Sequence, residues 1–167
     1  MSFPEIVVQR RVRLLTENRR SILFICTANS IRSQIAEAIV NAKSDQLIAY
    51  SAGIRPVGFV DGRVVDVMAE IGISMDSHES KGLDEFKDKQ VDISITMCGT
   101  AYAQCPYWLY DSSLSGHWGF KDVSRKGKSA FRHLRDQIQV HIQKFLVEYS
   151  PELTDEEVKA LLRKHML

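Results

Sequence analysis

The stretch SILFICTANSIRSQIAE, residues 21–37, constrains the fold of this chain more than any other segment. An apolar, β-branched run typical of a buried strand ends at Cys26, a short polar loop follows, and from Arg32 the apolar residues take helical spacing. A buried strand followed closely by a helix is the building unit of a parallel sheet. We therefore expect a strand at 21–26, a loop at 27–31 and a helix at 32–43.

Cys26 and Arg32 have the CX5R spacing of a thiolate held in an oxyanion-binding loop. At the start of a helix, several backbone N–H groups have no intrahelical partner, and together with the helix dipole they favour a negatively charged sulfur. The guanidinium of Arg32 adds a planar fork of donors that matches two oxygens of a tetrahedral oxyanion. The spacing thus predicts a nucleophile and its substrate class. The alternative is an ordinary buried cysteine, since free cysteine is often buried.

The rest of the chain alternates between strand and helix patterns, which indicates a parallel sheet covered on both faces. Residues 99–128 are polar and aromatic, and we interpret them as a functional loop with a short strand near His117. Thr154 and Glu157 have the spacing of a capping box for a last helix. Further strands are expected at 47–51 and 91–97, and further helices at 4–19, 61–71, 82–88, 129–148 and 154–165.

The composition is that of an ordinary globular domain. The 167 residues are 44% apolar and 26% charged with a net charge of +1, which gives no argument for a nucleic-acid partner. No apolar run approaches the length of a membrane span, and Arg10, Arg11 and Arg13 interrupt any signal-peptide core. We therefore expect a cytoplasmic protein with no membrane partner.

The chain has three cysteines, and this odd number argues against a framework of structural disulfides. Cys98 and Cys105 are too far apart for a CxxC zinc knuckle, and the histidines form no HxxxH pair. We expect no metal site, and catalysis or redox exchange is the better use for these thiols. The alternative is that Cys98 and Cys105 are a buried and an exposed bystander.

Two blocks of residues resemble a known family. The loop ICTANSIRSQIAEA is similar to the active-site loop of the low-molecular-weight tyrosine phosphatase superfamily, in particular its thioredoxin-coupled arsenate reductases. Met97-Cys98-Gly99, Cys105-Pro106 and the run from His117 to Asp122 resemble the rest of the reductase pattern. The resemblance implies an α/β three-layer sandwich with a four-stranded parallel sheet of order 2-1-3-4. It covers about residues 20–149, so we expect a domain at 21–149, a helical extension at 1–20 and a C-terminal helix at 150–167.

The resemblance also implies a role for each cysteine and no cofactor. Cys26 would attack arsenate, Cys98 would attack Cys26 and release arsenite, and Cys105 would take over the disulfide, which thioredoxin reduces. Asp122 would be the general acid, although Val123 stands where proline is usual and Lys121 replaces a second acid. The alternative for Asp122 is a solvated loop charge. The oxyanion would be bound across the loop, by Thr27, Ala28, Asn29, Ser30, Ile31, Arg32 and Ser33.

Several residues around the loop have expected supporting roles. Ser33 would donate a hydrogen bond to the thiolate, or cap the helix, or both. Asn29 would hold the shape of the loop and suits a left-handed backbone, whereas Ala28 stands where the family usually has glycine. Some relatives bind potassium beside this loop. Lys81 stands where one ligand is acidic, so its ammonium group would replace the ion, and we expect no bound potassium.

Three functions remain open at this point. Thioredoxin-coupled arsenate reduction is favoured, because Cys98 and Cys105 have no use in a phosphatase. A phosphatase acting on phosphotyrosine or small phosphate esters would use the same Cys26 and Arg32, but no tyrosine follows Asp122 to frame a substrate ring. A non-catalytic redox sensor is the third possibility. The arginine-rich segment 1–20 is expected to be a packing helix, or else a contact for an oligomer or a partner.

Overall fold

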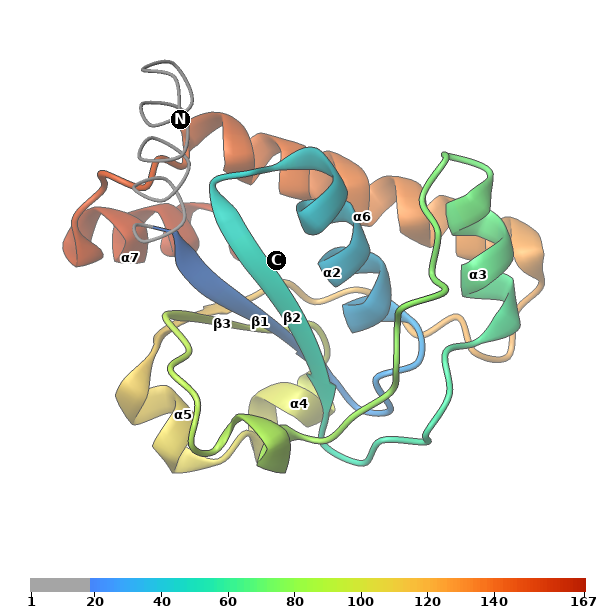
Figure 1. Ribbon diagram of the computed structural model, residues 1–167, viewed down its shortest axis with the longest axis horizontal. Helices are drawn as coiled ribbons and strands as arrows, with labels where there is room; N and C mark the ends of the chain where they lie inside the picture. Colours follow the sequence, from blue (N-terminus) through green and yellow to red (C-terminus); the bar gives the residue numbers. More distant parts are fainter. Residues whose placement is uncertain (1–18) are drawn as a thin grey trace, which may run out of the picture.

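The computed structural model describes residues 19–167, and its centre is a parallel sheet of four strands in the order β2-β1-β3-β4 (Figure 1). This confirms the α/β fold and the strand order expected from the sequence. The strands are β1 (Arg20–Cys26), β2 (Leu47–Gly53), β3 (Ile93–Thr96) and β4 (Leu114–His117). The helices are α2 (Arg32–Lys43), α3 (Gly62–Ala69), the 3₁₀ turn η1 (Leu83–Phe86), α4 (Gly99–Gln104), α5 (Tyr107–Ser112), α6 (Lys128–Glu148) and α7 (Asp155–Lys164).

β1 is one of the two interior strands, and it ends at Cys26, at the side of the sheet where the carboxyl ends of the strands lie. It pairs with β2 on one side and β3 on the other, and the run from Ile22 to Ile25 has no solvent exposure. A strand buried on both faces has an almost continuous apolar sequence, so this run can be recognised as a buried strand from the sequence alone. The carboxyl ends of β1 and β3 meet at the same edge, where ligands bind in open parallel sheets.

Helices cover both faces of this sheet (Figure 1). On one face, α6 packs against both α2 and α3, and on the other face α4 contacts β1 and β3. The side chain of Trp118, directly after β4, is fully buried, with its ring against those of Phe24, His141 and Phe145. Trp118 therefore has a packing role in the core between the sheet and α6.

α7 packs on the edge strand β4, and the expected capping box of Thr154 and Glu157 is present. Arg20, at the start of β1, donates to the carbonyl of Leu153 at 2.6 Å and pairs with Asp155 at 3.1 Å. These contacts join the beginning of the sheet to the C-terminal helix. The boundaries of the domain at 21–149 stay a prediction, and the helix expected at 4–19 lies almost wholly outside the described residues.

The segment after β3 differs from the expectation. Residues 99–112, interpreted from the sequence as part of a long loop, form the two short helices α4 and α5, and only the strand near His117 was foreseen. Each helix has six residues, too few to show a helical apolar period, and Pro106 separates them. None of the helices in residues 19–167 has the length and apolar composition needed to cross a bilayer.

Candidate active site

Cys26 is the last residue of β1 and is 2% exposed. Its Sγ lies 2.9 Å from the hydroxyl of Ser33, in the first turn of α2. The amide of Asn29 donates to that same hydroxyl at 2.9 Å, so the proton of the hydroxyl is free to point at the sulfur. This geometry matches the expected hydrogen bond from Ser33 to a Cys26 thiolate.

Asn29 holds the loop between β1 and α2 from inside. It is fully buried with φ of 49°, which confirms the expected left-handed conformation. Its Oδ1 accepts from the backbone N–H of Lys81 at 2.8 Å and from the amide of Gln34 at 3.0 Å. Ala28 is not among the residues with positive φ, so alanine in place of the usual glycine adds no backbone strain.

The carbonyl groups of the loop are fixed by the segment that follows β2. The backbone N–H groups of Ile54, Arg55 and Val57 donate to the carbonyls of Cys26, Thr27 and Ala28 at 3.1, 2.8 and 3.2 Å. Within residues 19–167, the N–H groups of residues 27–31 donate none of the hydrogen bonds found. The loop therefore keeps a row of unused donors beside Cys26, which is what an oxyanion needs.

Gly53 is where the loop and β2 touch most closely. A Cβ at this position would lie 2.9 Å from the backbone nitrogen of Asn29 and 2.9 Å from the carbonyl oxygen of Thr27. Since both are backbone atoms, no side chain can move aside to make room. Gly53 lies just beyond the strand expected at 47–51, and nothing in the sequence pattern marks this close contact.

Arg32 begins α2, and its guanidinium donates to the carbonyl of Phe120 at 3.2 Å. Asp122 lies two residues further along this irregular segment, on the surface. The backbone N–H of Ser124, which donates to its carboxylate at 2.8 Å, lowers the pKa of Asp122, and the charge of Arg32 adds to this. The structure thus brings Asp122 to the Arg32 side of the loop.

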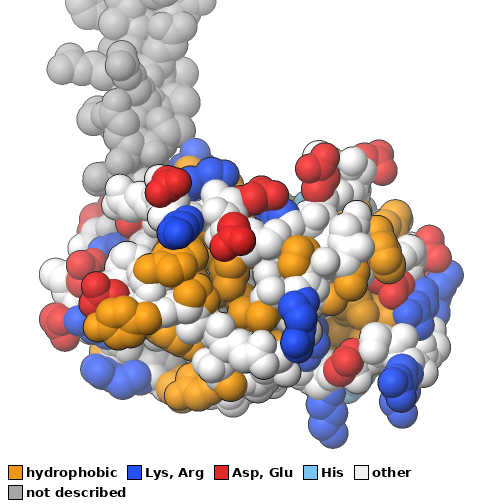
Figure 2. Space-filling view, turned by 90° about the horizontal axis from the view of Figure 1, so that it is seen from below, with side chains coloured by type: hydrophobic (Ala, Val, Ile, Leu, Met, Phe, Trp, Pro, Cys, Tyr) orange, Lys and Arg blue, Asp and Glu red, His pale blue; other side chains and the backbone are white. Residues whose placement is uncertain are grey.

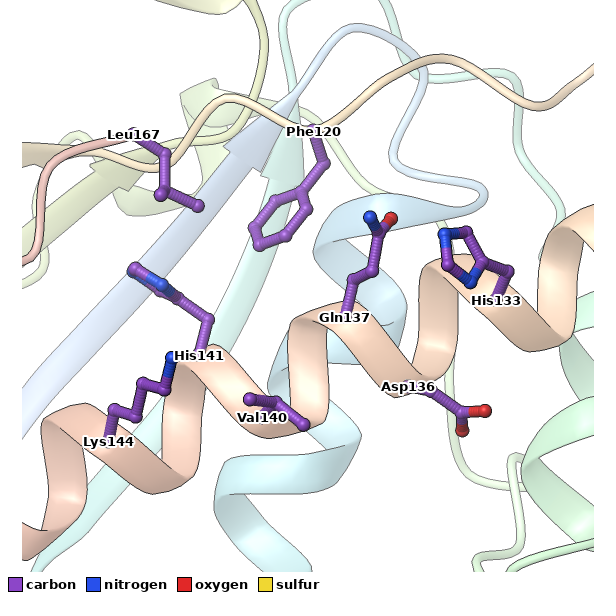
Figure 3. Close-up of a pocket in the computed structure, with 8 residues that line it drawn as sticks. All are labelled: Phe120, His133, Asp136, Gln137, Val140, His141, Lys144 and Leu167. Carbon is purple, nitrogen blue, oxygen red and sulfur yellow. The ribbon is translucent and has the colours of Figure 1, made fainter.

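The side chain of Phe120 lines a pocket of about 390 Å³ on α6 (Figure 3). Leu167 and Phe120 form one wall and His141 part of the floor. Burial and the neighbouring His165 lower the pKa of His141 to about 4, so its ring is neutral at physiological pH. Cys26 is not among the residues that line this pocket.

Cys98 caps the N-terminus of α4, two residues beyond the end of β3, which is one residue shorter at this end than the strand expected at 91–97. It is 7% exposed, and its Sγ lies 3.4 Å from the hydroxyl of Thr27 and accepts from the N–H of Ala101 at 3.4 Å. The structure therefore brings the second cysteine next to the residue that follows Cys26.

Cys105 is the C-cap of α4 and is half-buried. Burial raises the pKa of its thiol to about 11, and a side-chain hydrogen bond with Tyr110 works in the opposite direction. The sequence interpretation placed Cys105 in a loop, whereas here it ends a helix. In this conformation the thiol is protonated at neutral pH.

A polar network beneath the loop includes residues that sequence reasoning missed. The amide of Gln34 donates to the carbonyl of Glu79 at 2.9 Å, and its Oε1 lies 2.9 Å from Nδ1 of His78. Burial lowers the pKa of His78, although the carboxylate of Glu37 opposes this. No spacing in the sequence marks Gln34 or His78, because the residues that they contact lie on other elements.

Lys81 approaches the carboxylate of Glu37 at 3.9 Å, and that carboxylate accepts from the hydroxyl of Ser51. The ammonium group also donates to the carbonyl of Glu79 at 3.2 Å. A cationic side chain thus stands beside the carboxylate where the resemblance places a potassium ion. Residues 19–167 contain no cluster of three or more His, Cys, Asp or Glu side chains that could hold a metal.

Comparison with known proteins agrees with this geometry. The model of the low molecular weight phosphotyrosine protein phosphatase family matches residues 21–161. Arsenate reductase 1 of Staphylococcus saprophyticus is 38% identical over 129 residues, covering 77% of this chain and 97% of that protein. An arsenate reductase of Staphylococcus aureus is 37% identical over 128 residues, with coverage of 76% and 96%.

Solved structures give the same picture. An arsenate reductase from Archaeoglobus fulgidus is 26% identical, with a TM-score of 0.66 over 75% of this chain and 98% of its own. An arsenate reductase in the phosphate binding state has a TM-score of 0.69 at 23% identity, covering 78% of this chain and 99% of its own, and this likeness concerns the fold alone.

Proposed function

The chain belongs to the low molecular weight phosphotyrosine protein phosphatase family, and we propose that it reduces arsenate to arsenite with Cys26, Cys98 and Cys105 as a thiol relay. One observation carries the proposal: the Sγ of Cys98 lies 3.4 Å from the hydroxyl of Thr27, the residue next to the nucleophile. A phosphatase has no use for a second thiol there. The arsenate reductases at 37–38% identity support the same conclusion.

The first step uses the oxyanion loop. Arsenate binds to the free N–H groups of residues 27–33 and to Arg32, which exchanges the carbonyl of Phe120 for the substrate. The Cys26 thiolate attacks arsenic and forms a sulfur–arsenic bond. One arsenic–oxygen bond breaks, and this oxygen leaves as water after it takes a proton from Asp122.

The second step is the reduction itself. The Cys98 thiolate attacks the sulfur of Cys26, so that a disulfide forms and the sulfur–arsenic bond breaks. The electron pair of that bond stays on arsenic, which changes from As(V) to As(III) and departs as arsenite. The two thiols are oxidised by the two electrons that arsenic gains. A short path between Cys98 and the loop is what this step requires.

In the third step Cys105 attacks Cys98, and Cys26 leaves as a thiolate. Cys98 and Cys105 are the two caps of α4, seven residues apart, so an intact helix separates their Cα atoms by about 10 Å. A disulfide allows at most about 7 Å between Cα atoms. We infer that α4 unwinds in this step, which also frees the Cys105 thiol from the burial that raises its pKa.

A dithiol protein then reduces the Cys98–Cys105 disulfide, and we propose thioredoxin in this role. The face that carries α4 and α5 has many apolar side chains among uncharged ones (Figure 2). Tyr102 and Tyr107, on either side of Cys105, are 58% and 79% exposed. Such a face is suited to contact with another protein once the disulfide comes to the surface. A thioredoxin partner agrees with a cytoplasmic location, which we also propose.

A second function, hydrolysis of phosphate monoesters, is favoured by the loop itself. Cys26, Arg32 and Asp122 suffice for a phosphocysteine intermediate and its hydrolysis by water, and phosphate has the charge and shape of arsenate. We therefore expect weak phosphatase activity beside the reductase activity.

The test measures NADPH consumption by this protein with thioredoxin, thioredoxin reductase and arsenate. Wild type is compared with Cys26→Ser, Cys98→Ser and Cys105→Ser, and phosphate-ester hydrolysis is assayed on the same samples. We expect arsenate turnover to need all three thiols, and ester hydrolysis only Cys26. Fast ester hydrolysis without arsenate turnover, unaffected in the Cys98 and Cys105 variants, would show a phosphatase instead.

A further inference from the structure

The last four carbonyl groups of an α-helix have no intrahelical partner, and in the helix between the two relay cysteines one of them cannot gain a backbone donor from the residues that follow. In an α-helix, a carbonyl accepts from the N–H four residues further on. For Tyr102 in α4 that residue is Pro106, which has no N–H. The bond at the start of the same helix, from the N–H of Tyr102 to the carbonyl of Cys98, is present at 3.0 Å. α4 thus depends on a donor from outside to complete its last turn.

Tyr110 of α5 supplies this donor. Its hydroxyl donates to the carbonyl of Tyr102 at 2.9 Å, across the turn that contains Cys105 and Pro106. The side chain of Leu109 in α5 is fully buried and anchors this helix, so the position of the neighbouring Tyr110 is fixed. The hydroxyl therefore acts as a cap for α4 that the chain provides from a different helix.

Burial raises the pKa of Tyr110 to about 12, and the neighbouring Cys105 and Tyr102 add to this. The phenol therefore keeps its proton at neutral pH and remains a donor to the Tyr102 carbonyl. The turn that this hydrogen bond closes contains Cys105, the thiol that must move in the third step.

We propose that Tyr110 is a positioning residue for the relay: its hydroxyl caps α4 in place of the absent Pro106 N–H and so stabilises the dithiol form against the Cys98–Cys105 disulfide. This inference rests on the proposed function. A disulfide between the two caps requires α4 to unwind, and the Tyr102 carbonyl then moves away from Tyr110. The hydrogen bond is therefore present in the reduced state only, and its energy favours that state.

The experiment is a redox titration of the full chain against dithiothreitol, in the Cys26→Ser background so that only Cys98 and Cys105 can pair. Tyr110→Phe removes the hydroxyl and keeps the ring. Tyr107→Phe is the matched control, since it makes the same change in the same helix at a side chain that is 79% exposed. Trapped thiols are counted by mass spectrometry after alkylation, and thermal unfolding verifies that each variant is folded.

We expect Tyr110→Phe to shift the equilibrium toward the disulfide by about fivefold, the effect of one net hydrogen bond, which is about 20 mV more negative in potential. Tyr107→Phe should not move it. An unchanged or less negative potential for Tyr110→Phe would overturn the role of Tyr110 while leaving the relay intact. If no Cys98–Cys105 disulfide forms in any of the proteins, the relay fails and the role of Tyr110 with it.

Discussion

The two cysteine-bearing regions are built in opposite ways. The loop after Cys26 is fixed from several sides, by backbone bonds from residues 54–57, by the buried Asn29 side chain and by the close contact with Gly53. The segment from Cys98 to Ser112 consists of two six-residue helices separated by a proline, and its helix α4 is capped by one tyrosine hydroxyl.

This difference fits the role that we propose for each region. An oxyanion is stabilised best by donors that are already in place, since no free energy is then lost in arranging them. A thiol relay instead needs two sulfurs to meet that an intact helix holds apart. The contrast has a measurable consequence: a change near the loop should lower ester hydrolysis and arsenate reduction together, whereas a change near α4 should lower only the reduction.

The largest effect is expected for Asp122→Asn, which removes the carboxyl group that we propose as the proton donor. General acid catalysis contributes about 10²-fold or more, so both reactions should fall by about that factor. The loss should be greater for phenyl phosphate than for p-nitrophenyl phosphate, because the poorer leaving group needs the proton more. Asp88→Asn, at another exposed aspartate, is the matched control. Equal losses for the two esters would argue against a general acid.

The pH dependence of phenyl phosphate hydrolysis is a second test of Asp122, because a general acid must be protonated to act. Because Ser124 and Arg32 lower the pKa of Asp122, its protonated form is depleted already at moderately acidic pH. The wild-type rate on phenyl phosphate should therefore decline as the pH rises from 5 to 8, and the decline should be weaker in Asp122→Asn. A parallel decline in both proteins would assign the pH dependence to another group.

The next effect is expected for Gly53→Ala, which disturbs the loop without touching a chemical group. The added methyl group would meet two backbone atoms of the loop at 2.9 Å, so the loop must shift. We expect a loss of about 1–3 kcal/mol in the free energy of unfolding, as for overpacked sites, measured by urea denaturation. Both activities should fall by a similar factor, about tenfold or more.

Gly62→Ala is the control for this change, because a Cβ at Gly62 meets nothing within 4 Å. It should leave both activities and the stability close to wild type. If Gly53→Ala lowered arsenate reduction but spared ester hydrolysis, the two regions would not be separate in the way described above.

Much of this architecture could be predicted from the sequence, and the parts that could not have a common physical cause. The run before Cys26 was recognisable because a strand buried on both faces has no polar residues, and the helix 128–148 because its apolar face repeats over 21 residues. α4 and α5 are too short for such a pattern. Contacts such as Gln34 with Glu79 or Tyr110 with Tyr102 depend on elements that only the folded chain brings together.

A smaller and selective effect is expected for Gly99→Ala, at the first residue of α4. A Cβ here meets nothing within 4 Å, and alanine favours a helix over glycine by up to about 1 kcal/mol. Since the proposed third step requires α4 to unwind, we expect arsenate turnover to slow by about two- to fivefold while ester hydrolysis is unchanged. Gly127→Ala, at another open position, is the control. Faster arsenate turnover would contradict the need for unwinding.

The smallest effect concerns the cation beside the loop. The ammonium group of Lys81 lies 3.9 Å from the carboxylate of Glu37, in a position where a potassium ion would add a second positive charge. We therefore expect the same melting temperature and activity for wild type in potassium and in sodium chloride. Lys81→Met removes the ammonium and leaves the Glu37 carboxylate, which is only 14% exposed, with the Ser51 hydroxyl and the ring of His78 as its remaining neighbours. In this variant potassium should raise the free energy of unfolding relative to sodium by about 1 kcal/mol. A potassium response already present in wild type would mean that Lys81 does not replace the ion, and the loop would then have a support that its own side chains do not supply.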